Sequence, residues 1–342
     1  MRALVVPVLC LSLLAAPARA QSLDAVDATP AASIVVADGS EPAPEQIHVV
    51  AQRPGPGMWK VTKGDHVLWV FGTYAPLTKD IAWRSQQVEN AIRNSQEYLA
   101  PPGATIKPGF FKTITLLPSL IGVRKNPDGA QLRDVMPQED YARWRTLKAK
   151  YLPTNSDVER ERPIFAAQTL SEAARKQAGL VSGNVVRKKV MDLVKQNKLT
   201  ETSSTFVIPS DNAGALLKNF KKTTLADAAC LTQTMATLEA DIDAASARAN
   251  AWAKGDIDAM RALNHAERKA CFESLVNSAA FDAEPEVKNM EARANAKWLV
   301  SAENALAANT STFAMLPIDD VFDPKGVIAA LAAKGYVVEQ PD

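Results

Sequence analysis

A hairpin pattern at residues 57–73 constrains the fold of this chain more than any other feature. Trp59 and Val61 alternate with polar residues, and a Gly-Asp pair at 64–65 supplies a tight turn. Residues 67–71 are then apolar without interruption, which is typical of a strand buried on both faces. The pattern predicts an N-terminal β-hairpin whose second strand is covered on both sides.

The rest of the sequence predicts an α/β fold. A small mixed sheet carries the hairpin at one end and a C-terminal strand-helix-strand at the other, and a mostly helical region occupies roughly residues 110–280. Pro137 and Pro163 each stand where the first turn of a helix tolerates proline. Asp323, followed by proline, is expected to cap the last helix, which Gly335 ends. Further helices are expected at 83–97, 185–195, 211–220, 225–253, 257–280 and 285–308, and strands at 98–100, 204–208, 312–316 and 336–339.

The N-terminus, residues 1–20, has the pattern of a cleaved secretory signal peptide. Arg2 gives a positive start, and residues 3–16 form an apolar stretch that is too short for a good membrane span. A small-x-small cleavage site ends at Ala20, directly before Gln21. An uncleaved anchor is the alternative. We therefore expect an exported protein, periplasmic or secreted, without an integral membrane segment after cleavage.

Composition predicts a linker followed by one folded region. Residues 21–56 are rich in Ala, Pro, Asp and Gln and predict a disordered linker, which leaves residues 57–342 as the folded domain. A hydrophobic content of 47% is enough for a sizeable core. The 39 basic and 38 acidic residues nearly balance, and this argues against a nucleic-acid partner.

Cleavage of the signal peptide would leave two cysteines in the mature chain. Cys10 lies in the signal peptide, so Cys230 and Cys271 alone remain in the mature chain. An even number of cysteines in an exported protein favours a disulfide, here one that would join two helices. Such a bond would stabilise the fold by about 2–4 kcal/mol. Two separate buried thiols are the alternative.

The hairpin runs into Gly72-Thr73-Tyr74-Ala75. With its C-terminal strand-helix-strand, the sequence resembles the TraB/GumN family, relatives of the Tiki metalloproteases, over roughly residues 57–339. In that family the second strand leads into Gly-Thr-x-His, and the histidine is a metal ligand. Ala75 stands in the place of this histidine, and an alanine side chain cannot bind a metal. The resemblance therefore implies the family's fold without the first ligand of its site.

The other family ligands are replaced as well. The family has a second Gly-x-x-His between its last strand and helix, and residues 317–320 here read Pro-Ile-Asp-Asp, with Asp320 in the place of the histidine. The family's early strand ends in a glutamate, whereas this chain runs into Ala100-Pro101. A glutamate after the central strand is replaced by Ile208-Pro209. The resemblance thus implies a site that has lost four ligand positions.

Some features of the family's site remain in part. Asn295 is retained from an Arg-Asn pair on the late helix, while Arg293 is displaced, and Trp298 fits an aromatic or Met position of the family. Tyr74 is expected to fill the former metal cavity, with lining of a pocket as the alternative. The histidines have no metal-site spacing, and we interpret them as surface or helix-face residues: His48, His66 and His265.

The best candidates for a rebuilt metal site are Asp319, Asp320 and Asp323, because carboxylates on one turn can hold a hard cation. The alternative is ordinary: Asp323 caps a helix, and the other two are solvated turn residues. If the carboxylates are ordinary turn residues, we expect no cofactor. If they form a rebuilt metal site, we expect a divalent metal such as manganese, cobalt or zinc.

Three functions follow from these observations. The first is a secreted pseudoenzyme that binds an envelope protein or peptide on the family's scaffold, and the loss of both histidines favours it. The second is a metal-dependent peptidase or hydrolase that relies on Asp319, Asp320 and Asn295. The third is a structural envelope protein without a ligand. The sequence names no partner among these.

Overall fold

The computed structural model describes residues 55–107, 121–181, 184–209, 213–223, 227–262 and 285–341. The chain divides into two compact units, residues 1–51 and 52–342, and every described residue belongs to the second. None of the helices among these residues is both long enough and apolar enough to cross a membrane. Several predictions concern positions outside the described residues, namely the signal peptide with Ala20 and Gln21, the linker, His48, Asp211, His265 and Cys271.

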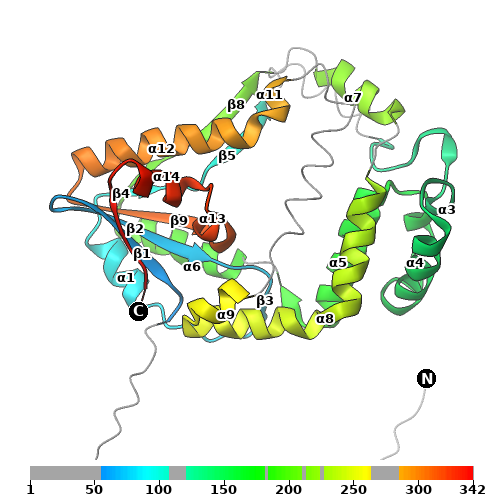
Figure 1. The fold of residues 1–342 in the computed structure, drawn as a ribbon, viewed down its shortest axis with the longest axis horizontal. Coiled ribbons are helices and arrows are strands. Elements are labelled where there is room, and N and C mark those ends of the chain that lie inside the picture. Colours follow the sequence, from blue (N-terminus) through cyan, green and yellow to red (C-terminus); the bar gives the residue numbers. More distant parts are fainter. Residues whose placement is uncertain are drawn as a thin grey trace, which may run out of the picture. The chain divides into compact units, whose positions relative to one another are not determined.

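The centre of the fold is a six-stranded mixed sheet, which confirms the predicted α/β class (Figure 1). Its two edge pairs differ: β10 and β1 are antiparallel, whereas β4 and β7 are parallel. In spatial order the strands are β10 (Val337–Glu339), β1 (Met58–Lys63), β2 (His66–Thr73), β9 (Ser311–Pro317), β4 (Glu97–Leu99) and β7 (Thr200–Thr202).

The predicted hairpin is β1 and β2, with its turn at Gly64 and Asp65. Strand β2 lies between β1, to which it is antiparallel, and β9, to which it is parallel. Leu68, Val70 and Phe71 are fully buried, because helices cover the sheet here. This position in the sheet explains why the apolar run of β2 has no alternation.

Two strand pairs lie outside the main sheet, and sequence reasoning found only one of their four strands. The predicted strand at 204–208 is β8 (Thr205–Pro209), and it pairs in parallel with β5 (Gly103–Lys107). The β5–β8 pair follows directly on the β4–β7 pair, and Ser204 donates a 3.1 Å hydrogen bond to the carbonyl of Ala100 at the break. The other pair is β3 (Leu77–Thr78) with β6 (Leu180–Val181).

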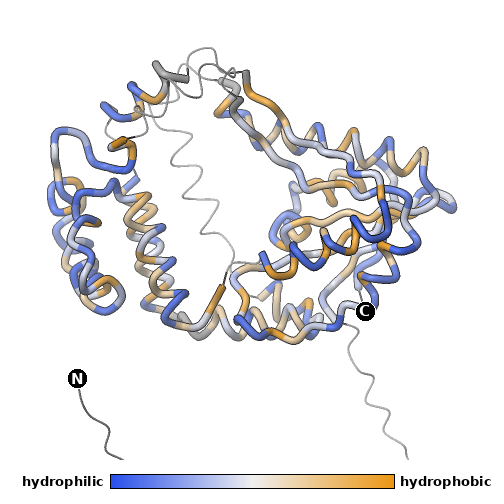
Figure 2. The backbone as a smooth tube through the Cα atoms, turned by 180° about the vertical axis from the view of Figure 1, so that it is seen from behind, coloured by the Kyte–Doolittle hydropathy of each residue, from blue (hydrophilic) through white to orange (hydrophobic). Residues whose placement is uncertain are grey.

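Helices pack their apolar faces against the main sheet. Figure 2 shows hydrophobic and hydrophilic residues alternating along these helices, as amphipathic helices require. The fully buried Trp298 comes from α12, and Tyr98 of β4 lies in the same core, where burial raises the pKa of its phenol to about 12. The helices with residues in this core include α1 (Gln86–Arg93), α6 (Asn184–Gln196), α9 (Ile257–Ala262), α12 (Met290–Ala308), α13 (Ile318–Phe322) and α14 (Val327–Ala333).

A second core is purely helical. It is built by α3 (Leu132–Val135), α4 (Gln138–Tyr151), α5 (Pro163–Gln177) and the first part of α8 (Ala228–Lys254). The later part of α8 contributes Trp252 to the core of the sheet. One helix of 27 residues therefore supplies side chains to both cores. Two further helices, α7 (Ala213–Lys222) and α11 (Pro285–Lys288), complete the described elements of this class.

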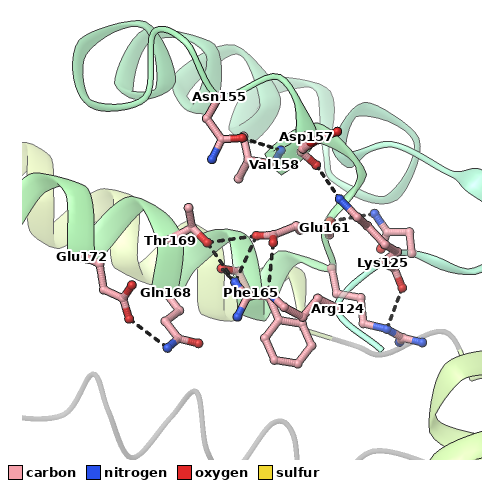
Figure 3. A network of polar contacts seen from close by, with 12 residues as sticks. Arg124, Lys125, Asn155, Asp157, Val158, Glu161, Phe165, Gln168, Thr169 and Glu172 are labelled. Carbon is pink, nitrogen blue, oxygen red and sulfur yellow. Dashed lines mark hydrogen bonds and ion pairs between the residues drawn. The ribbon is translucent and has the colours of Figure 1, made fainter. Parts of the chain in front are cut away.

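The segment before the helical core is held by a polar network (Figure 3). Arg124 donates to Glu161 at 3.0 Å and to the hydroxyl of Thr169 at 3.0 Å, and its guanidinium lies 4.8 Å from the ring centroid of Phe165. The backbone of Lys125 forms an isolated bridge with Glu161. These contacts fasten the chain near residue 124 to the beginning of α5.

The predicted start of the last helix is wrong. Asp323 does not cap it, since α14 begins at Val327 with Gly326 as its N-cap, and residues 318–322 form the unpredicted helix α13. A Cβ on Gly326 would lie 2.6 Å from the carbonyl oxygen of Asp320, so the close approach of the chain to itself requires glycine there. Asp323 instead accepts the backbone N–H of Lys325 at 2.8 Å.

Candidate functional site at the ends of β2 and β9

The structure brings together the two places where the family has its histidines. Strands β2 and β9 are parallel neighbours, with Gly72 opposite Leu316 and Thr73 opposite Pro317. Ala75 and Asp320 therefore follow the carboxyl ends of adjacent strands. In sheets of this kind ligands bind beyond the carboxyl ends of parallel strands, so these ends are the candidate functional site.

Gly72 is required at the end of β2 by packing. A Cβ there would lie 2.7 Å from Cζ3 of Trp59 and 3.4 Å from Cγ1 of Ile318. The carbonyl of Gly72 accepts a 2.8 Å hydrogen bond from the indole N–H of Trp252 on α8, and the hydroxyl of Thr73 donates to the carbonyl of Leu316 at 3.0 Å. The strand end is thus fixed both to a helix and to its neighbouring strand.

Tyr74 is buried, with 6% of its surface exposed, as expected for a side chain that fills space. Its hydroxyl accepts a 3.2 Å hydrogen bond from Nε of Arg248, one turn before Trp252 on α8. The rings of Phe71 and Trp252 lie 6.2 Å apart in the same core. Next to the place of the first family histidine, the structure therefore holds a phenol that is hydrogen-bonded to a guanidinium.

The carboxylates at the end of β9 lie on and after the short helix α13. Asp319 and Asp320 are in its first turn, Asp323 follows it, and all are partly buried. Among the residues that the structure describes, no group of three His, Cys, Asp or Glu side chains is placed to hold a metal ion. The three carboxylates of the predicted cation site do not form such a group in the described part of the chain.

The remaining family positions are spread over different elements. Ala100 follows β4, where its N–H donates to the carbonyl of Thr202 at 3.0 Å, while Pro209 ends β8, outside the six-stranded sheet. Asn295 lies partly buried on α12. On the same helix the guanidinium of Arg293 lies 4.1 Å from the ring centroid of Phe206, in β8. Pro209 and Ala100 thus follow strands of different sheets.

Two other predicted residues belong to the cores. Trp298 is fully buried, and its indole N–H has no hydrogen-bond partner within the part of the chain that the structure describes. Cys230 is buried in the helical core on the first turn of α8. Since Cys271 lies outside the described residues, the predicted disulfide stays a prediction.

His66 begins β2, and its Nδ1 lies 2.7 Å from the carbonyl oxygen of Leu306.

Sequence reasoning missed a cavity of about 150 Å³ beside the helical core. Its walls include Asn126, Arg162 and Asp227, all nearly inaccessible to solvent. Burial lowers the pKa of the Arg162 guanidinium and raises the pKa of the Asp227 carboxyl, because both charges have lost water. Pro163 had marked the start of a helix, but nothing in the sequence distinguishes the preceding arginine as buried.

The side chain of Arg162 is used structurally. It donates to the carbonyl oxygens of Lys125 at 3.1 Å, Thr223 at 2.8 Å and Phe220 at 2.6 Å. The latter two carbonyls lie at the end of α7, where a cation is favoured by the helix dipole. Asp227 accepts the free N–H of Ile164 in the first turn of α5 at 3.0 Å. Both side chains therefore cap helices rather than form a reactive pair.

The comparisons with known proteins agree with this geometry. Residues 57–340 match the model of the TraB/PrgY/gumN family, so the chain belongs to this family. The match begins directly before β1 and ends after β10, and therefore spans the whole six-stranded sheet. No curated protein and no solved structure matches the chain.

Proposed function

We propose that this protein is a non-catalytic member of the TraB/PrgY/gumN family that works as a binding or interaction module in the cell envelope. One observation carries the proposal: the place beside the family's first histidine holds a buried Tyr74 whose hydroxyl is bonded to the guanidinium of Arg248. A fixed cation at this point repels a metal ion, because like charges raise each other's free energy.

The described residues at these strand ends do not fit the metal that the family implies. Catalytic metal sites combine several imidazole or carboxylate ligands with one open position. Here β2 leads to Ala75, β4 leads to Ala100, and only the end of β9 offers carboxylates, Asp319 and Asp320. A rebuilt peptidase site on these two carboxylates is the competing function.

Export is part of the proposal and rests on the sequence. The apolar N-terminus with its small-x-small site supports a cleaved signal peptide, and the pair Cys230 and Cys271 supports a disulfide in an oxidising compartment. We propose the periplasm or the medium as the location and an envelope protein or peptide as the partner.

An activity assay separates the two functions. We expect the purified mature chain to leave a panel of peptides uncleaved in the presence of manganese, cobalt or zinc, because its strand ends lack a ligand set. Metal-dependent cleavage that disappears in Asp320→Ala, and persists in the exposed control Asp134→Ala, would establish a rebuilt peptidase and end the proposal. Circular dichroism of both variants checks that each is folded.

A further inference from the structure

Among the described residues of the candidate site, Arg248 is a side chain whose chemistry points to an anionic ligand. Its Nε donates to the hydroxyl of Tyr74 at 3.2 Å, and this is the bond that orients the guanidinium. The two terminal nitrogens have no hydrogen-bond partner within the described ranges. A guanidinium has five N–H donors, so four of them are available to a bound group.

No carboxylate neutralises this arginine in the part of the chain that the structure describes. Its neighbours one turn away on α8 are alanines and Trp252, so the usual ion pair within a helix is absent: positions 244, 245 and 251 are all alanine. A partly buried arginine without an acidic partner is an unusual arrangement, since charges with reduced access to water are ordinarily paired.

The position of Arg248 is fixed on both sides. One turn along α8, the indole of Trp252 holds the helix to the carbonyl of Gly72 at 2.8 Å, while Tyr74 holds the guanidinium itself. Trp252 and Tyr74 are both buried in the core of the sheet. A donor group that is already positioned loses little conformational freedom on binding, and this favours recognition.

We infer that Arg248 binds the carboxylate of a ligand at the carboxyl end of β2, so that an anion site has replaced the family's cation site. The inference rests on the proposed function, whose binding site it assigns to a class of ligand. The planar guanidinium presents two parallel N–H groups that match a carboxylate in bidentate geometry. A free peptide C-terminus and an acidic side chain both carry this group.

The charge at the site favours a carboxylate over a phosphate. Arg248 contributes a single positive charge, which matches a monoanion. Phosphate monoesters carry almost two negative charges at neutral pH and are ordinarily held by several cations or by a row of backbone N–H groups. Arg248 itself is partly buried, and reduced access to water strengthens an ionic hydrogen bond to its guanidinium.

The experiment is a titration of the metal-free mature chain, labelled with ¹⁵N at tryptophan and followed by NMR. The signal is the indole N–H of Trp252, assigned with Trp252→Phe. The probes are sodium N-acetylglycinate for the carboxylate, N-acetylglycinamide as its neutral counterpart, and methyl phosphate for the phosphate class. We expect saturable shifts with the carboxylate only, with a Kd on the order of millimolar.

Two variants and a control make the test specific. Arg248→Gln removes the charge and the two parallel N–H groups of the guanidinium. It should weaken N-acetylglycinate binding by about tenfold or more, the value of a charged hydrogen bond. Arg248→Lys keeps the charge without the parallel N–H groups. Its affinity for N-acetylglycinate should lie between those of the unmodified chain and Arg248→Gln. Arg133→Gln changes an arginine that is 60% exposed on the helical core and should bind as the unmodified chain does.

The outcomes decide between clear alternatives. Equal binding of acid and amide, equal affinity of Arg248→Gln and the unmodified chain with native circular dichroism, or absence of any shift would each overturn the inference. Preferential binding of methyl phosphate would replace the carboxylate by a phosphate. Failure of the inference leaves the proposed loss of catalysis standing, because peptide cleavage and metal content are measured separately.

Discussion

Arg162→Met is expected to lower the free energy of unfolding by about 3–5 kcal/mol, because it removes a buried guanidinium. The side chain is 1% exposed and donates to carbonyls of two separate segments, at Lys125 and at the end of α7 including Thr223. Methionine has a similar length but no donors, so several buried carbonyls lose their partners, each at a cost of about 1–3 kcal/mol. The adjoining cavity of about 150 Å³ has room for water, which would satisfy part of these carbonyls in the variant.

The measurement is urea unfolding followed by circular dichroism. Arg133→Met serves as the control, because this arginine is 60% exposed and should change stability by less than about 0.5 kcal/mol. Arg162→Lys retains the charge with three donors. Its free energy of unfolding should lie between those of the unmodified chain and Arg162→Met. Equal stability of the Arg162 and Arg133 variants would show that the buried guanidinium does not organise the end of α7.

Trp252→Ala should cost about 3–5 kcal/mol, the range for deleting a buried aromatic side chain. Trp252 is 1% exposed, its ring centroid lies 6.2 Å from that of Phe71 and 5.9 Å from that of Trp83, and it supplies the hydrogen bond to Gly72. Its loss leaves a cavity at the end of β2 and an unpartnered carbonyl there. Helix α8 would then lose its hydrogen bond to the end of β2.

A more conservative change isolates the hydrogen bond. Trp252→Phe keeps an aromatic ring but leaves the carbonyl of Gly72 unpaired, and should cost about 1–3 kcal/mol. Trp69→Phe is the matched control, since the partly buried Trp69 makes no indole hydrogen bond in the described part of the chain. Thermal unfolding of the two phenylalanine variants gives the comparison, and equal melting temperatures would contradict a role for the bond.

The parts of the fold that local patterns determine could be predicted. The hairpin has an alternating first strand and a Gly-Asp turn, and its paired residues lie close in the chain, since even the outermost pair, Met58 and Phe71, is only 13 positions apart (71 − 58). The helices beginning near Pro137 and Pro163 carry their start signals in the sequence. Strand β9, Ser311–Pro317, contains the strand that the sequence predicts at residues 312–316.

The parts that depend on distant contacts could not. Strand β5 follows two prolines and has little apolar pattern, and it forms because β8, a hundred residues later, pairs with it. Asp323-Pro324 is a normal helix start in isolation, yet the close approach of Gly326 to the carbonyl of Asp320 delays the helix. Local signals carry no information about such approaches.

The same distinction applies to the candidate site. Replacement of the family's histidine by Ala75 is visible in one short motif. The contact between Tyr74 and Arg248 joins residues 174 positions apart, and only the packing of α8 against the end of β2 reveals it. The burial of Arg162 is equally a product of tertiary structure, because an arginine before a helix is ordinarily exposed.

Loss of the family's metal is the central claim, and the metal content of the protein tests it most directly. The mature chain, residues 21–342, is to be purified from the periplasm without a histidine tag and measured by elemental mass spectrometry. We predict a folded protein with far less than one transition metal ion per chain. Close to one manganese, iron, cobalt or zinc ion per chain would contradict the claim and would assign a rebuilt metal site to this fold.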